Sequence, residues 1–244
     1  MNGTAIKGIL FDKDGTLLDF EATWRGFVRD VLEDLAPGDA ALQTRLGEAA
    51  GFHPASGRFV PGSALVAGST AEVARIWAAL LPDRCARTLE ADANARAERA
   101  LAGGPAAAVA DLPGFLDGLR ARGCALGVAT HDSEGAARAH MAALGALDRF
   151  DFIAGYDSGH GLKPGPGMVR AFCAAAGLAP GAVAMVGDSL HDLGAGRSAG
   201  AGLVVGVLTG PAGRADLAPH ADIVLASIAE LPAALDRRTA GPAP

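Results

Sequence analysis

The sequence predicts an α/β fold, in which a doubly wound parallel sheet is interrupted after its first strand by a block of helices. Three observations lead to this prediction. A short apolar run at 5–11 has the length and composition of a buried strand. Residues 20–100 then follow a helical period, and from residue 111 onward strand and helix patterns alternate. Such alternation is typical of parallel strands whose connecting helices cover both faces of the sheet.

The helical block divides into several expected segments. Apolar side chains recur with helical spacing over Phe20–Leu35, and a second helix is expected at 39–49. The stretch 51–68 is rich in Gly, Pro and Ser, which is typical of a loop. A helical pattern resumes over 69–100, with a break at Pro82. This block has the character of a helical cap inserted into the α/β domain.

The remaining sequence completes the expected α/β domain. Its segments are helix Leu112–Arg122, strand Cys124–Thr130, helix Glu134–Leu144, strand Phe150–Ala154, helix Pro166–Ala176, strand Val183–Val186, helix His191–Ala199, strand Leu203–Val207, strand Ile223–Leu225 and helix Ile228–Leu235. A stretch of small residues at 102–110 is the candidate linker. We therefore expect a core domain formed by 1–19 and 104–244, and a cap domain formed by 20–103.

The composition restricts the class of protein. The chain has 244 residues, is 50% hydrophobic and 20% charged, and has a net charge of -6, as expected of a globular protein that does not bind nucleic acid. No apolar run approaches the roughly 20 residues of a membrane-spanning helix, and the N-terminus does not have the pattern of a signal peptide. The cysteines Cys85, Cys124 and Cys173 lie in apolar surroundings, so we expect buried free thiols. A bacterial, cytoplasmic protein is the simplest interpretation.

Polar side chains follow four of the expected strands. Asp12-Lys13-Asp14-Gly15-Thr16 follows the first strand, Thr130 ends the second, Lys163-Pro164 follows the third, and Gly187-Asp188 with Asp192 follows the fourth. In open parallel sheets, ligands bind beyond the carboxyl ends of the strands, so these groups should converge. Several carboxylates this close repel one another unless a cation neutralises them, and Mg²⁺ prefers such oxygen ligands. Lysine is a suitable partner for phosphate.

These motifs, in this order, resemble those of the haloacid dehalogenase-like phosphatases. The segment 12–17 is similar to the first motif of that superfamily, and Thr130, Lys163 and Asp188 with Asp192 are similar to the second, third and fourth. The resemblance covers the whole chain, including a cap inserted after the first motif. It implies a Rossmann-like core with a helical cap.

The resemblance also implies catalytic roles. Asp12 would attack phosphorus and form an aspartyl-phosphate, while Asp14 would protonate the leaving oxygen and then activate water. Thr130 and Lys163 would hold the phosphoryl oxygens. A merely solvated lysine is the competing interpretation of Lys163.

The implied cofactor is Mg²⁺, held by Asp12, the backbone carbonyl of Asp14 and Asp188. Asp192 would orient these groups from behind. The competing interpretation of Asp192 is a carboxylate at the start of a helix, stabilised by the helix dipole.

One position departs from the superfamily pattern. Where the superfamily usually places Asn after the Thr of the second motif, this sequence has His131, followed by Asp132. The simpler interpretation is a polar replacement that caps the next helix. The sharper one is a titratable group beside the phosphate that makes activity sensitive to pH near neutrality.

Two other motifs suggest different enzymes. Gly187-Asp188-Ser189-Leu190 matches a signature of serine hydrolases, but it lies late in the chain and lacks a correctly spaced Asp and His near the C-terminus. The glycine pattern of Gly194–Ala199 matches a dinucleotide-binding motif, but it does not directly follow a strand. We expect neither activity.

Within the superfamily, the residues favour a phosphatase. Dehalogenases lack the second acid of the first motif, which is present here as Asp14. Phosphonoacetaldehyde hydrolases need a Schiff-base lysine in the cap, and residues 20–103 contain no lysine. A phosphomutase of the β-phosphoglucomutase type carries a cap histidine soon after the first motif, whereas 19–25 contains none and His53 is the only histidine of the expected cap. Phosphoglycolate phosphatase is the nearest resemblance. A phosphomutase and a non-catalytic phosphate-binding relative are the alternatives.

The expected partner is a small phosphorylated metabolite, and the expected assembly is a monomer or homodimer without nucleic acid or membrane. The cap loop 51–68 should set the choice of substrate. Arg58 is its one permanently charged cation and can bind a substrate carboxylate with two hydrogen bonds. The competing interpretation is that Arg58 is a solvated loop residue.

Overall fold

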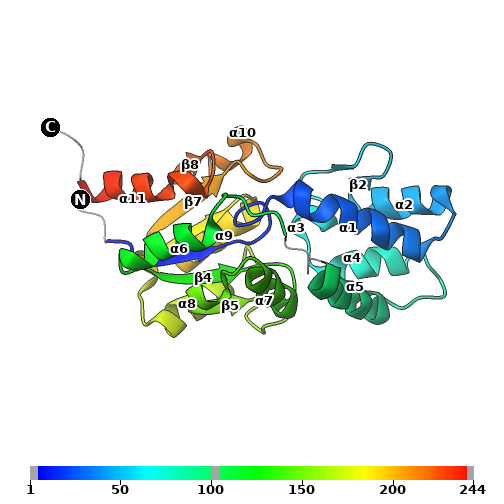
Figure 1. Cartoon of the computed structure of the whole chain (residues 1–244), viewed down its shortest axis with the longest axis horizontal. Helices are drawn as coiled ribbons and strands as arrows, with labels where there is room; N and C mark the ends of the chain where they lie inside the picture. Colours follow the sequence, from blue (N-terminus) through cyan, green and yellow to red (C-terminus); the bar gives the residue numbers. More distant parts are fainter. Residues whose placement is uncertain (1–4, 101–104, 241–244) are drawn as a thin grey trace.

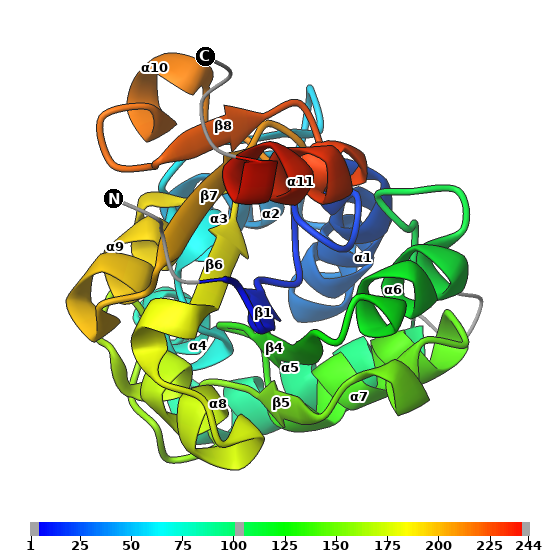
Figure 2. The ribbon, with the colours of Figure 1, turned by 90° about the vertical axis from the view of Figure 1, so that its left-hand side faces the viewer.

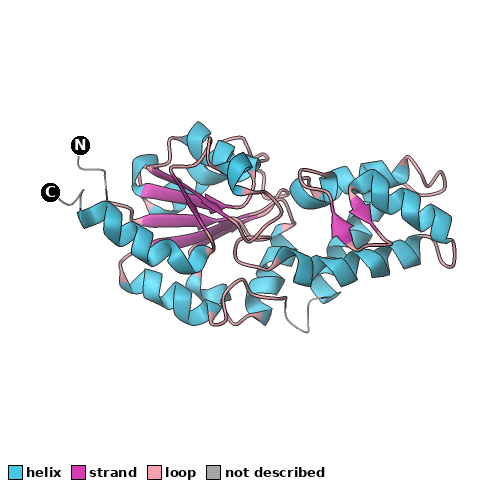
Figure 3. Ribbon diagram, turned by 90° about the horizontal axis from the view of Figure 1, so that it is seen from above, coloured by secondary structure: helices cyan, strands magenta, loops and turns pink. Residues whose placement is uncertain are grey.

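The computed structural model describes residues 5–100 and 105–240. The described chain forms two lobes, one built on a sheet and the other almost entirely helical (Figure 1). Figure 3 shows the strands of the larger sheet side by side in one lobe, and a short two-stranded hairpin among the helices of the other. The expected α/β fold with an inserted helical cap is confirmed.

The main sheet has six strands in the order β5-β4-β1-β6-β7-β8. The strands are β1 (Gly8–Phe11), β4 (Ala125–Ala129), β5 (Phe152–Ala154), β6 (Val183–Gly187), β7 (Leu203–Val207) and β8 (Ile223–Leu225). Every neighbouring pair is parallel, with Phe11 opposite Val128 on one side and Val186 on the other. All their carboxyl ends therefore lie at one edge of the sheet.

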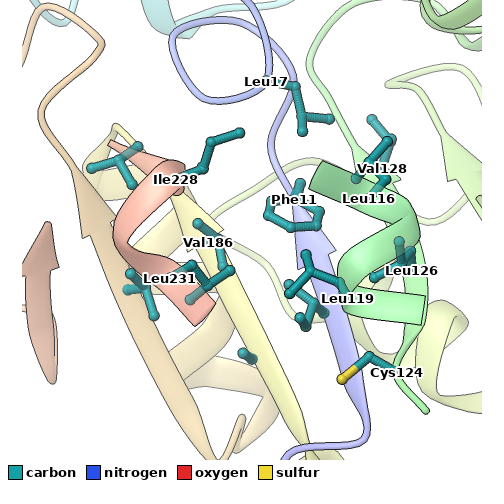
Figure 4. Packing of buried hydrophobic residues seen from close by; sticks show 14 of the residues in the cluster. Phe11, Leu17, Leu116, Leu119, Cys124, Leu126, Val128, Val186, Ile228 and Leu231 are labelled. Carbon is teal, nitrogen blue, oxygen red and sulfur yellow. The ribbon is translucent and has the colours of Figure 1, made fainter. Parts of the chain in front are cut away.

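Helices cover both faces of this sheet (Figure 2). They are α6 (Leu112–Ala121), α7 (Glu134–Ala143), α8 (Gly167–Ala176), α9 (Leu190–Ala199), α10 (Arg214–Leu217) and α11 (Leu231–Ala240), with 3₁₀ turns η2 (Leu147–Arg149), η3 (Pro180–Ala182) and η4 (Ile228–Glu230). One apolar cluster joins α6, α7 and α11 to the sheet, and a second joins α8 and α9 to its opposite face. In Figure 4, Leu116 and Leu119 of α6 lie over Phe11, and Leu231 of α11 lies beside Val186.

The central strands carry almost no polar side chains because both of their faces are covered. Every residue of β1, β6 and β7 is buried, as expected of a parallel sheet between two layers of helices. Burying a side chain the size of Leu or Phe contributes about 1.5–3 kcal/mol. A rigid sheet of this kind fixes the positions of the residues that follow each strand.

The cap contains α1 (Phe20–Leu35), α2 (Ala40–Ala50), β2 (Phe52–His53), β3 (Arg58–Phe59), α3 (Ala64–Ala67), α4 (Thr70–Ala78) and α5 (Ala86–Ala100). These elements share an apolar cluster of their own, separate from those beside the sheet. The hydrogen bond from Trp77 Nε1 to the Leu46 carbonyl, 3.0 Å, ties α4 to α2. A separate apolar cluster is what an inserted domain requires.

The stretch 51–68 is more ordered than the expected loop. It contains the antiparallel pair β2–β3 and the short helix α3. The buried rings of Phe52 and Phe59 lie 4.9 Å apart, and Gly57 has a φ of 69° in the turn between the strands. Burial of the two rings therefore explains a hairpin that the Gly, Pro and Ser content does not predict.

Three other expectations can be compared with the structure. The expected junction between cap and core, 103–104, lies outside the described residues, so the domain boundaries stay a prediction. The cysteines are free, and Cys124 and Cys173 are buried as expected. Cys85, just before α5, is exposed, so the expectation that it is buried is wrong. Within the described ranges, no helix has both the length and the apolarity to cross a membrane.

Candidate functional site

Asp12 and Asp188 lie where the winding of the sheet changes direction. The chain leaves β1 toward β4 and leaves β6 toward β7, which lie on opposite sides of this neighbouring pair. Asp12 and Asp188 follow the two strands directly, and the Asp12 N–H still donates to the Val186 carbonyl at 2.8 Å. A crevice forms at such a switch point, and it is the usual ligand site of open α/β sheets.

A buried ion-pair cluster surrounds Asp12. Lys163 Nζ lies 2.6 Å from Asp12 Oδ1 and 2.6 Å from Asp192 Oδ1, and it also donates to the Ala129 carbonyl at 2.9 Å. Burial lowers the pKa of Lys163, but the two carboxylates outweigh this and leave that pKa above its ordinary value. Lys163 is therefore a permanent cation beside Asp12 and not a solvated lysine.

Burial also acts on the carboxyl groups. It raises the pKa of Asp12 to about 7, against the opposing effect of Lys163. The pKa of Asp188 is likewise raised well above its ordinary value, first by burial and then by the charge of Asp12. One lysine does not offset three neighbouring carboxylates, so this cluster favours a further cation.

Asp192 belongs to the capping box of α9 and also contacts Lys163. It is residue N3 of α9, and its Oδ2 accepts hydrogen bonds from the Ser189 N–H at 3.0 Å and the Ser189 hydroxyl at 2.6 Å. Its Oδ1 accepts from Lys163. One carboxylate oxygen of Asp192 therefore completes the capping box of α9, and the other holds Lys163 in place. The Ser189 hydroxyl is engaged in this cap, and the glycine pattern 194–199 lies inside α9 and not before a helix.

The backbone packs closely around Asp188. Gly15 has a φ of 82°, and a Cβ there would lie 2.6 Å from Asp188 Oδ2. A Cβ on Gly210 would lie only 1.7 Å from the same oxygen, and the Thr209 hydroxyl donates to the Gly15 carbonyl at 2.6 Å. The sequence reasoning missed the segment 209–210. The one feature of the sequence that could have indicated this segment is Gly210, which comes shortly after β7.

The oxygen set of this crevice fits a small divalent cation. Asp12, Asp188 and Asp192 each offer a carboxylate oxygen, and these oxygens lie within 4.8 Å of one another. Two ligands on opposite sides of a magnesium ion are about 4.2 Å apart, twice the Mg–O distance. Both oxygens of Asp192 already accept hydrogen bonds, so Asp12 and Asp188 are better placed as ligands.

Thr130 completes the group of residues at the strand ends. It follows β4, is buried, and lies on the cavity that also exposes Asp12 and Lys163. Its hydroxyl accepts from the Asp132 N–H at 3.1 Å, which leaves the hydroxyl proton for an oxygen in the cavity. The structure thus brings together Asp12, Thr130, Lys163 and Asp188, as expected, although their catalytic roles stay proposals.

Comparison with known proteins agrees with this arrangement of strand-end residues. The sequence profile of the haloacid dehalogenase-like hydrolases matches residues 6–200. The chain belongs to the haloacid dehalogenase-like hydrolases. A phosphoglycolate phosphatase of Rhodospirillum rubrum is 33% identical over 208 residues, which cover 82% of this chain and 78% of that protein.

Two further proteins are similar to this haloacid dehalogenase-like hydrolase. A phosphoglycolate phosphatase of Chromobacterium violaceum is 39% identical over 124 residues, which cover 49% of this chain and 54% of that protein. The crystal structure of a predicted phosphoglycolate phosphatase from Haemophilus somnus has a TM-score of 0.69 at 21% identity, over 94% of this chain and 97% of that one. At that identity, the likeness concerns the fold.

In this hydrolase, Asp14 is held by two donors. Lys13 Nζ lies 2.6 Å from its Oδ2, and Trp24 Nε1 of the cap donates to its Oδ1 at 2.6 Å. Lys13 is fully buried and also contacts Asp132 at 3.2 Å and His140 Nδ1 at 3.1 Å. The sequence reasoning missed this network. Its signal was a lysine inside a motif that must be buried, which requires nearby anions.

The same network crosses from the core to the cap. His140 Nε2 lies 3.1 Å from the carbonyl of Ala97 in α5. Because Nδ1 faces an ammonium group, which has no acceptor, the proton of His140 must be on Nε2. Burial, followed by the charge of Lys13, lowers the pKa of His140 and keeps the ring neutral. The backbone of α5 is thus joined to the group that holds Asp14.

His131 makes another contact between core and cap. Its Nδ1 donates to the Ala67 carbonyl at 2.7 Å, and its buried Nε2 has no hydrogen-bond partner among the described residues. Burial, followed by the charge of Lys163, lowers its pKa to about 4. The sharper of the two interpretations of His131, a group that titrates near neutrality, is therefore wrong. The role of capping α7 belongs to Ser133, whose hydroxyl accepts from the Ala136 N–H.

A cavity of about 120 Å³ lies between the two lobes. The core lines it with polar side chains: Asp12, Asp14, Thr130, His131, Asp132, Lys163, Asp188, Ser189 and Asp192. The cap lines it with residues of α1, α3, α4 and α5 and with Phe59. This volume holds several groups of the size of water. The cavity therefore joins the carboxylate and lysine cluster to a surface of different chemistry.

Arg58 lies outside this cavity. It is an exposed residue of β3, paired with His53 across the hairpin, and it is not among the described residues that line the cavity. The parts of the cap loop that do line it are Phe59 and the later segment 64–68. The inward side of the hairpin is taken by Phe59, because alternate residues of a strand point to opposite sides.

Proposed function

We propose that this chain is a Mg²⁺-dependent phosphatase that hydrolyses a small-molecule phosphate monoester through an aspartyl-phosphate on Asp12. The observation that carries the proposal is the contact of Asp12 with Lys163 on the floor of a cavity, at the switch point of the sheet. Family membership and the two relatives named phosphoglycolate phosphatase support it. On these names, 2-phosphoglycolate is one candidate substrate.

In the first step, Asp12 attacks phosphorus as the bond to the leaving oxygen breaks. The free carboxylate oxygen, Oδ2, is suited to this attack because Oδ1 accepts from Lys163. Thr130 and Lys163 hold the oxygens of the phosphoryl group. Mg²⁺, held by Asp12, Asp188 and the Asp14 carbonyl, would supply positive charge to the phosphoryl oxygens and keep Asp12 ionised.

In the second step, Asp14 takes a proton from water as this water attacks the phosphorus of the aspartyl-phosphate. The bond between phosphorus and Asp12 breaks, which releases inorganic phosphate. Trp24 and Lys13 donate to the two oxygens of Asp14, an arrangement that suits the carboxylate of this second step. To protonate the leaving oxygen in the first step, Asp14 must gain a proton and give up one of these contacts.

Two observations bear on the alternatives. His53, the only histidine in 20–103, is exposed and lies outside the described lining of the cavity, so nothing there supplies the cap histidine of a phosphomutase. A phosphate-binding relative without activity would still bind phosphate but would not turn over an ester. The described site has each residue type that turnover requires.

Turnover of p-nitrophenyl phosphate by the purified protein with Mg²⁺ tests this function. Rapid acid quenching followed by mass spectrometry should find a phosphoryl group on the peptide that contains Asp12. A matched sample of Asp12→Asn should not carry it. Absence of turnover across a broad panel of phosphate esters would refute the proposal, and a phosphoryl group on another residue would refute the role of Asp12.

A further inference from the structure

The cap half of the cavity has no charged side chain among the described residues that line it. Its wall consists of aromatic and aliphatic groups, and its side-chain polar groups are the hydroxyls of Ser69 and Thr70 and the indole N–H groups of the two tryptophans. The apolar residues on this wall include Trp24, Phe27, Phe59, Leu65, Val66 and Trp77. A leaving group that points from the phosphate site toward the cap therefore meets an apolar surface.

The indole N–H groups on this wall are engaged in holding the fold. Trp24 Nε1 donates to Asp14, and Trp77 Nε1 donates to the Leu46 carbonyl. The Ser69 hydroxyl accepts from the Glu72 N–H as the cap of α4, so it and the Thr70 hydroxyl can offer uncharged donors but no positive charge. The buried Nε2 of His131 has no hydrogen-bond partner in the described part of the chain, but in the neutral ring it is an acceptor and offers nothing to an anion.

The core half offers no spare cation either. Among the described residues on the cavity wall, Lys163 is the only lysine or arginine, and it already contacts Asp12 and Asp192. Asp14 and Asp132 also face the cavity and would repel a second anion. A carboxylate on the leaving group would lose its hydration without gaining a cationic side chain among the described residues of the wall, whereas an apolar group gains by leaving water.

We propose that this site selects phosphate monoesters of apolar alcohols, alkyl or aryl, and discriminates against esters whose leaving group carries a carboxylate. The inference rests on the proposed phosphatase function and names its substrate class. It runs against 2-phosphoglycolate, whose leaving group is a carboxylated alcohol. Trp24, Phe27, Leu65 and Val66 are the specificity-determining residues, because they are only partly buried within the fold and form the wall beyond the phosphate.

Matched substrates test the selection directly. Benzyl phosphate and 4-carboxybenzyl phosphate have similar leaving oxygens and differ by one carboxylate. We expect kcat/KM to be at least about tenfold higher for benzyl phosphate, and to rise about fourfold per methylene along ethyl, propyl and butyl phosphate until the cavity is filled. Equal or higher kcat/KM for 4-carboxybenzyl phosphate or 2-phosphoglycolate would overturn the inference while leaving the phosphatase function intact.

An added cation should reverse the selection. Val66→Arg places a guanidinium group on the wall of the cavity, and it should shift the ratio of kcat/KM toward 4-carboxybenzyl phosphate by at least about tenfold. Val60→Arg is the matched control, because the Val60 side chain is 38% exposed on the same cap loop and is not among the described residues that line the cavity. The control should keep the wild-type ratio.

A second variant guards against a folding defect. Leu65→Arg makes the same change at the neighbouring position, and the melting temperature of each variant shows whether the cap is folded. A folded Val66→Arg or Leu65→Arg protein with the wild-type ratio would overturn the assignment of this wall. If the wild-type protein turned over no phosphate ester at all, the phosphatase function itself would be refuted. Failure of the substrate preference and failure of the phosphatase function are therefore distinguishable.

Discussion

The two halves of the cavity are built in opposite ways. The core half consists of polar and charged residues that come after parallel strands, and among them Asp12 and Asp192 are buried and both contact the buried Lys163. The cap half consists of aromatic and aliphatic residues from helices and a hairpin, and several of them are only partly buried. On the proposed function, this difference would place bond breaking in the core half and recognition of the leaving group in the cap half.

The comparison also shows where the two halves depend on each other. Trp24 donates to Asp14, the Ala67 carbonyl accepts from His131, and the Ala97 carbonyl accepts from His140. Each contact joins a cap element to a residue next to the chemistry. Changes in the core half should therefore act on every substrate, changes in the cap wall should act on selectivity, and changes at these contacts should act on turnover with modest effects on binding.

The largest effect should come from the core. Asp12→Asn replaces the proposed nucleophile by an amide, which should lower kcat by at least about 10³-fold on every ester. Steady-state assays with p-nitrophenyl phosphate and benzyl phosphate check this. More than a few per cent of wild-type kcat, with contaminating phosphatases excluded, would remove Asp12 from the mechanism.

Metal removal should act as broadly as loss of Asp12. Excess EDTA should abolish turnover, because the carboxylates at 12, 188 and 192 need a cation, and Mg²⁺ should restore it. Ca²⁺ should restore it poorly, since its larger and looser coordination alters the in-line geometry. Turnover that persists in EDTA would mean that the core half works without a metal.

A tenfold effect is expected at the contact between the halves. Trp24→Phe keeps an aromatic wall but removes the N–H that holds Asp14, so kcat should fall by about tenfold while KM for benzyl phosphate changes little. Trp77→Phe is the matched control, because it removes a hydrogen bond to Leu46 instead. This control should lower the melting temperature more than it lowers kcat. A reversed pattern would separate Trp24 from the positioning of Asp14.

A smaller effect is expected at His131. Because burial lowers its pKa to about 4, the ring is neutral near pH 7, and His131→Asn should leave the shape of the pH–rate curve unchanged between about pH 6 and 9. The ordinary pKa of histidine is 6.5, so on acidification His131 is protonated in the unfolded chain before it is protonated in the folded one. The neutral, buried ring therefore costs the folded protein stability progressively as the pH falls from 6.5 toward 4.

Melting temperatures measure that contribution. On lowering the pH from about 8 to about 5, the melting temperature of wild type should fall more steeply than that of His131→Asn, which lacks the titrating ring. Parallel curves would place His131 in solvent in the folded protein. An inflection in the pH–rate curve near neutrality that His131→Asn abolishes would restore its role as a pH-sensitive group.

The smallest effect should come from Arg58. Arg58→Ala should change kcat/KM by less than about twofold on 2-phosphoglycolate and on benzyl phosphate alike, because the side chain is exposed outside the described lining. A loss confined to 2-phosphoglycolate would show that the hairpin moves over the cavity, and it would place a cation in the cap half after all.

The expected positions of Asp12, Thr130, Lys163 and Asp188 agreed with the structure because each follows a strand. The carboxyl ends of parallel strands meet at one edge, so the order of strands and motifs is enough to place them together. The cap loop was harder to predict, because Gly, Pro and Ser indicate turns without indicating which side chains turn inward. The charge of Arg58 favoured it as a substrate ligand. Because the neighbouring Phe59 is buried, Arg58 instead points to the opposite, exposed side of the strand.

By itself, the sequence determined the α/β alternation, the inserted helices and the residues of the polar floor, since periodicity and strand-end motifs are local properties of the chain. Only the tertiary structure decided that Lys13, Trp24 and His140 meet around Asp14, that the cap presents an apolar wall, and that His131 is neutral. These features depend on contacts between distant segments and on exclusion of water. Composition and spacing do not encode which partners a buried charge finds.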